Sequence, residues 1–127
     1  MKIDTRQLKR LIERLLTYLR LQDKHLSLLL TDNKGIKRLN KTYFNKDKPT
    51  NVISFSYMEN QANLSSLDII GDIAISVEMA AYEAGMSGRS FSERLTELII
   101  HGLVHILGFD HEKGEKEARR MRYRERK

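Results

Sequence analysis

The apolar positions of this chain follow helical spacing in some segments and strand spacing in others. Residues 4–21 carry leucine and isoleucine at helical intervals with a basic outer face, which predicts an amphipathic helix capped by Asp4 or Thr5. The apolar positions of this helix are Leu8, Leu11, Ile12, Leu15, Leu16 and Leu19.

Three segments have the pattern of strands. HLSLLLT at 25–31 is apolar enough for a buried strand, and the turn sequence DNKG follows it at 32–35. NVISFSY at 51–57 alternates small and large side chains with the two-residue period of a strand. LDIIGDIAIS at 67–76 predicts a mostly buried strand that is interrupted by Gly71.

Helical segments lie between these strands. Ile36, Leu39 and Tyr43 share one helical face, VEMAAYEAG predicts a helix that stops at Gly85, and the polar stretch 58–67 predicts a loop. Strands and helices do not alternate regularly enough for a doubly wound fold. We therefore expect an α+β fold: a small mixed sheet of about four strands with surrounding helices, in one domain over residues 1–127.

The clearest helix start lies in the last third of the chain. Ser90 and Glu93 have the spacing of a capping box, in which each side chain bonds a backbone N–H at the helix start. The helix continues to Leu107, where Gly108 is suited to end it. Because residues 98–107 are apolar on nearly every face, this helix is expected to be central and buried.

Composition limits the compartment and the partners. No apolar run is long enough for a membrane span, and the charged start MKIDTRQLKRL does not suit a secretory signal, so we expect a soluble, cytoplasmic protein. The net charge of +6 is uneven: 13 Lys and Arg stand against 5 Asp and Glu in residues 1–57, 2 against 9 in 58–112, and 8 against 3 in 113–127. The basic ends, including the C-terminal segment 113–127, suggest a nucleic acid as partner, although a solvated lysine-rich surface would look the same.

Three of the four histidines stand within HGLVHILGFDH at 101–111. His101 and His105 are four residues apart and so lie on one side of the helix, and Gly108 allows the chain to turn so that His111 can approach them. Three imidazoles with one position left open suit a catalytic zinc ion, and the absence of cysteine leaves only nitrogen and oxygen ligands. The sequence therefore predicts one Zn²⁺ per chain; another transition metal, or histidines that serve only packing, are the alternatives.

The spacing H-x-x-x-H-x-x-G-x-x-H also occurs in metzincin proteases, whose second motif residue is a glutamate that acts as general base. Gly102 stands at that position here, which disfavours a protease. Asp110 and Glu97 are near enough in sequence to orient a histidine or to help deprotonate water, although an ordinary solvated carboxylate is the favoured interpretation of each.

HGLVHILGFDH resembles the H-G-x-x-H-x-x-G-[YF]-D-H signature of the YbeY family of bacterial endoribonucleases. LNKTYFNKDKPTNVISF (39–55) is similar to that family's second motif and DIIGDIAIS (68–76) to its third. The resemblance implies a small mixed sheet with surrounding helices and zinc held by His101, His105 and His111. It also implies metal-dependent hydrolysis of single-stranded RNA, rather than DNA, in maturation of the 3′ end of 16S ribosomal RNA and in ribosome quality control, with rRNA and the small ribosomal subunit as partners.

The chain departs from the family pattern at Phe44, where an arginine is common. A guanidinium would stabilise the negative charge that builds on a phosphoryl group, and phenylalanine cannot. Lys41, Lys46 and Lys48 lie nearby but lack the planar fork of arginine. An alternative is therefore a ribosome-assembly or RNA-binding factor with a structural metal and weak or no nuclease activity; a zinc hydrolase of peptides or amides is a third.

Overall fold

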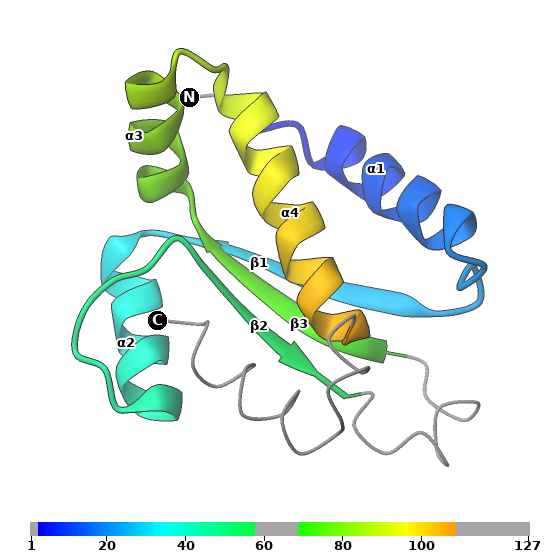
Figure 1. Ribbon diagram of the computed structural model, residues 1–127, viewed down its shortest axis with the longest axis horizontal. Helices are drawn as coiled ribbons and strands as arrows, with labels where there is room; N and C mark the ends of the chain where they lie inside the picture. Colours follow the sequence, from blue (N-terminus) through cyan, green and yellow to red (C-terminus); the bar gives the residue numbers. More distant parts are fainter. Residues whose placement is uncertain (1–2, 58–68, 109–127) are drawn as a thin grey trace.

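The computed structural model describes residues 3–57 and 69–108, and Figure 1 shows how their elements are arranged. The four helices and three strands follow one another as α1 (Thr5–Tyr18), β1 (His25–Thr31), α2 (Asn33–Phe44), β2 (Val52–Ser56), β3 (Ile69–Ser76), α3 (Val77–Ser87) and α4 (Phe91–Leu107). Among these described residues, no helix is long and apolar enough to cross a membrane. The expected loop at 58–67 and the basic segment 113–127 lie outside the described residues.

The strands form one mixed sheet in the order β1-β3-β2, with β3 in the centre. β1 runs parallel to β3, whereas β2 runs antiparallel to it. The α+β class is confirmed, but the described part of the chain has three strands where about four were expected.

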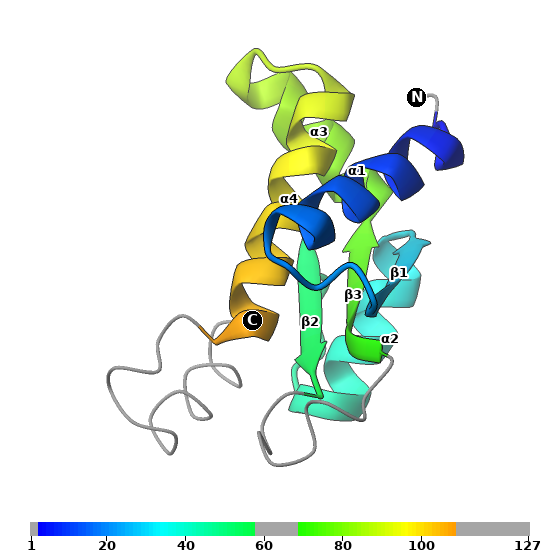
Figure 2. The same ribbon diagram turned by 90° about the vertical axis from the view of Figure 1, so that its right-hand side faces the viewer.

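Helices cover both faces of the sheet, as Figure 2 shows. On one face, α1 and α4 pack over a core that includes Leu16, Ile73, Leu103 and Ile106. On the other face, α2 packs over a smaller cluster, which consists of Ile36, Ile53, Ala74, Leu39, Phe44 and Phe55. The two-residue alternation of β2 explains this division, because Val52 belongs to the first cluster and its neighbour Ile53 to the second.

Three local expectations were wrong. Strand β1 is not buried: its side chains alternate between exposed and half-buried because it lies at the edge of the sheet. The sequence at 32–35 is not a free turn but the start of α2, since the Asp32 carboxylate accepts a hydrogen bond from the Gly35 N–H at 2.8 Å and caps the helix. Helix α3 passes through Gly85 and ends at Gly88, whose φ of +71° is the left-handed conformation that favours glycine.

Candidate metal site on helix α4

Helix α4 begins and ends where its sequence predicts. The Ser90 hydroxyl accepts a hydrogen bond from the Glu93 N–H at 3.0 Å, and the Glu93 carboxylate accepts one from the Ser90 N–H at 2.9 Å, so the capping box is confirmed. At the other end Gly108 has a φ of +65° and closes the helix. These two ends fix which residues fall in the last two turns, where His101 and His105 lie.

The expectation that α4 is a central, buried helix holds for one side of the helix only. One stripe of the helix faces the sheet and is buried: Leu95, Leu98, Ile99, Gly102, Leu103 and Ile106. The opposite stripe reaches solvent, and there His101 is exposed and His105 half-buried. Ile100 and Val104 flank the histidines and are each 41% exposed. Both histidines therefore lie on the side of α4 that faces away from the buried stripe.

The rings of His101 and His105 converge. Their Nε2 atoms are 3.2 Å apart, and the ring planes meet at 77° with centroids 4.6 Å apart. Two nitrogens bound to one tetrahedral zinc ion at about 2.0–2.1 Å each lie about 3.3 Å apart, so the observed separation suits two ligands of the same ion. A hydrogen bond between one ring N–H and the other ring's lone pair gives a similar distance.

The third expected ligand, His111, lies outside the described residues, as does Asp110. Within residues 3–57 and 69–108, no group of three or more His, Asp or Glu side chains could hold a metal ion. The structure thus brings together two of the three predicted histidines.

Gly102 lies between the two histidines on the buried side of α4. A Cβ at this position would be 2.9 Å from Cδ1 of Ile73, a side chain that is fully buried in β3. A glutamate, such as the metzincin general base at this motif position, does not fit between α4 and the sheet. The glycine instead allows the helix that carries the histidines to approach the sheet closely.

A serine that the sequence did not single out ties the end of α4 to the sheet. Ser56, the last residue of β2, donates a hydrogen bond from its hydroxyl to the backbone carbonyl of Ile106 at 2.8 Å. The carbonyls of the last helical turn have no partner within the helix, so this bond satisfies one of them. The alternation of residues 51–57 predicts on which face of the sheet Ser56 lies. It does not predict the hydrogen-bond partner of Ser56, because that partner is 50 residues away in the sequence.

Glu97 is paired with two arginines. Its carboxylate accepts a hydrogen bond from Arg94 at 3.0 Å and forms an ion pair with Arg89. Arg94 also contacts the Glu83 carboxylate at 2.9 Å, and Glu83 in turn accepts from the side-chain amide of Asn51 at 3.3 Å. These hydrogen bonds and ion pairs join α3, α4 and the start of β2. Within them, the Glu97 carboxylate contacts the guanidinium groups of Arg89 and Arg94.

Phe44 is a packing residue at the end of α2. Its ring is half-buried and stacks on Phe55 with centroids 5.6 Å apart and planes at 13°. Of the nearby lysines, Lys41 is exposed and lies 4.0 Å from the Asp47 carboxylate. The position of the family's arginine is thus part of the apolar cluster under α2.

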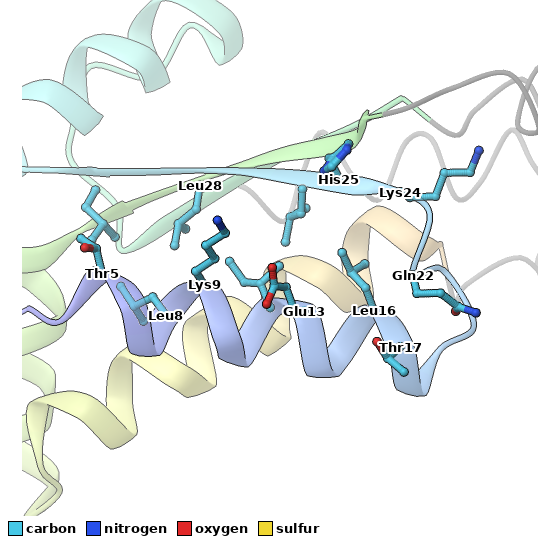
Figure 3. A pocket seen from close by; sticks show the side chains of 13 residues that line it. Thr5, Leu8, Lys9, Glu13, Leu16, Thr17, Gln22, Lys24, His25 and Leu28 are labelled. Atoms are coloured by element: carbon cyan, nitrogen blue, oxygen red, sulfur yellow. The ribbon is translucent and has the colours of Figure 1, made fainter.

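A hollow of about 610 Å³ lies between α1 and β1, away from the candidate site (Figure 3). Its lining includes leucines from both elements, together with Lys9, Glu13 and His25. Its lining includes no residue of α4. His25, the fourth histidine of the chain, thus lines a hollow that is separate from the pair on α4, and its substitution is a suitable control for substitutions of that pair.

Known proteins resemble the chain in both fold and sequence. The solution structure of TM1509 from Thermotoga maritima superimposes with a TM-score of 0.62 at 27% identity, over 98% of this chain and 84% of that one. Endoribonuclease YbeY of Geobacter metallireducens is 46% identical over 125 residues, which is 98% of this chain and 83% of the relative. Endoribonuclease YbeY of Aquifex aeolicus is 40% identical over 121 residues, which is 95% of this chain and 79% of the relative.

The model of the family described as endoribonuclease YbeY matches residues 1–127. The fold and these matches define an endoribonuclease, a hydrolase that acts on RNA. The chain belongs to the YbeY family.

Proposed function

We propose that this protein is a zinc-dependent endoribonuclease specific for single-stranded RNA, with His101, His105 and His111 as the ligands of one ion. The observation that carries the proposal is the approach of the two Nε2 atoms to 3.2 Å on an exposed helix face. The chain contains no cysteine, so the site depends on nitrogen and oxygen ligands.

The donor set fits zinc used as a Lewis acid. When bound, the ion would supply two effects: it lowers the pKa of water towards about 7 and offsets negative charge on the phosphoryl oxygens. The residues of the chain itself hold the two histidine rings in place. The absence of a side chain at Gly102, which lets α4 lie close to Ile73, and the hydrogen bond from Ser56 hold the last turns of α4 against the sheet, and these turns carry the two converging rings.

We further propose a role in late maturation of the 3′ end of 16S rRNA and in ribosome quality control in the cytoplasm, with the small ribosomal subunit as partner. This part rests on the motifs at 39–55, 68–76 and 101–111 and on membership of the family. The net charge of +6 suits an RNA partner.

A second candidate has a specific observation in its favour. Phe44 replaces an arginine and packs on Phe55, so that position offers no cation to the phosphoryl group. A ribosome-assembly or RNA-binding factor with a structural metal would tolerate this change, because it needs no stabilised transition state.

Cleavage of an end-labelled single-stranded RNA tests the proposal. Wild type is depleted of metal and assayed with and without added zinc, beside His105→Ala and the control His25→Ala, which removes a histidine from β1. We expect zinc to restore cleavage in wild type and in the control, and His105→Ala to lose at least ~100-fold, since metal ions contribute several kcal/mol to such reactions. A duplex of the same sequence should remain uncut.

Two other outcomes are informative. Equal cleavage by wild type and His105→Ala would contradict the proposal. If neither cuts RNA but zinc raises the melting temperature of wild type and not of His105→Ala, the metal is structural and the second candidate is correct.

A further inference from the structure

The face of the sheet that α2 partly covers carries a shallow groove, here called the α2 groove. It consists of two adjoining hollows of about 510 and 360 Å³, which share Leu29, Leu39 and Tyr43 as lining residues. The larger hollow extends to Tyr57 beyond the end of β2, and the smaller one extends to Arg38 on α2. The groove thus runs across the sheet from one edge strand to the other.

Exposed tyrosines with defined partners line the α2 groove. Tyr43 is 59% exposed and packs edge-on against Phe55, with centroids 5.1 Å apart. Tyr57 is 45% exposed, and its hydroxyl donates a hydrogen bond to the Asp72 carboxylate. This bond raises the pKa of the Tyr57 phenol. Fixed, solvent-exposed rings are suited to stack on another flat ring.

The helix beside the groove is basic. Residues 33–44 include four cations, Lys34, Lys37, Arg38 and Lys41, and contain no aspartate or glutamate. Asp47 lies 3.9 Å from Lys37 and 4.0 Å from Lys41, and all three side chains are exposed, so these pairs neutralise the helix only weakly.

The α2 groove lies across β2 from the histidine helix. Alternate residues of β2 point to opposite faces of the sheet. Ser56 bonds the last turn of α4 on one face, whereas Phe55 and Tyr57 line the groove on the other. The groove and the last turn of α4 thus lie on opposite faces of the same edge strand.

We propose that the α2 groove binds an unpaired base of single-stranded RNA, stacked on Tyr43, with the cations of α2 contacting its phosphates. The inference rests on the RNA substrate that the family implies, and it is independent of the metal. Aromatic platforms next to a positively charged track are the usual means of binding single strands, since every base has a face that can stack. A peptide partner of apolar character would not need the four cations.

Fluorescence anisotropy of a labelled single-stranded RNA of about ten nucleotides tests the groove by binding alone. The protein is used as purified, and Tyr43→Ala is compared with Tyr43→Phe and with Tyr82→Ala, which removes an exposed tyrosine from α3 outside the groove. We expect Tyr43→Ala to raise the Kd about 10-fold and the other two variants to stay within about twofold. The same RNA with abasic residues should bind wild type and Tyr43→Ala equally.

Unchanged binding in Tyr43→Ala, or an equal loss with base-bearing and abasic RNA, would overturn the proposal and leave the groove to a protein partner. Arg38→Ala gives a second readout that does not put the fold at risk, since Arg38 is exposed. It should reduce the slope of log Kd against log salt by about 0.7, the contribution of one phosphate contact in a single strand, and an unchanged slope would contradict the role of α2. Loss of cleavage in His105→Ala with intact binding separates this proposal from that of the metal site.

Discussion

Replacing Gly102 by alanine should weaken the packing of α4 on the sheet, whereas the same change at Gly85 should stabilise α3. Both glycines lie inside helices, where alanine is favoured by up to about 1 kcal/mol, so this gain is common to the two variants. Their surroundings differ. A Cβ at position 85 meets nothing within 4 Å, whereas a Cβ at position 102 meets three side-chain carbons of Ile73 at 2.9 to 3.1 Å.

The magnitude follows from the rigidity of the neighbour. Ile73 is fully buried in the central strand, and its branched side chain has few alternative rotamers. Overpacking of this kind costs about 1–3 kcal/mol. The free energy of unfolding of Gly102→Ala should therefore lie about 1–3 kcal/mol below that of Gly85→Ala, whatever the intrinsic gain of alanine.

Urea unfolding followed by circular dichroism measures both variants beside wild type. We expect Gly85→Ala to unfold at higher urea concentration than wild type and Gly102→Ala at a lower concentration than Gly85→Ala. Equal midpoints for the two variants would refute the argument, because they would mean that α4 does not rest on Ile73 through Gly102.

Three further predictions concern single hydrogen bonds. Ser90→Ala should cost about 1 kcal/mol of stability by removing the cap of α4, whereas Ser92→Ala in the same turn should cost less, and chemical denaturation should separate them. Ser56→Ala should cost about 1 kcal/mol in the same assay and weaken zinc binding, because a carbonyl in the last turn of α4 loses its donor. The hydrogen bond to Asp72 raises the pKa of Tyr57. The stability that this bond contributes is therefore complete below the ordinary tyrosine pKa and is lost as the pH rises through the raised pKa of the folded protein. Ultraviolet titration should show one tyrosine that ionises at higher pH than the others, and this transition should be absent in Tyr57→Phe.

The spacing of apolar residues predicted where helices and strands form better than it predicted how exposed their side chains are. Strand β1 was expected to be buried because HLSLLLT is apolar, yet Leu29 is 50% exposed. Burial depends on whether another strand or helix covers an element, and the composition of β1 does not contain that information. The same holds for α4, where Ile100 and Val104 are apolar and remain exposed beside the histidines.

Local signals with a defined partner nearby were reliable. Ser90 and Glu93 satisfy each other within one helical turn, and Gly108 closes α4, so both ends of this helix could be predicted. The hydrogen bond from Ser56 and the arginine partners of Glu97 depend on contacts between elements and could not. The spacing of His101 and His105 predicted their convergence, which the helix enforces by its own geometry.

The zinc content of the purified protein tests the central claim most directly. Wild type, His101→Ala, His105→Ala and the control His25→Ala are dialysed against the same zinc buffer, and bound metal is measured per chain. We expect about one ion per chain in wild type and in the control, and a large loss in each α4 variant. Equal zinc in all four proteins, or none in wild type, would contradict it.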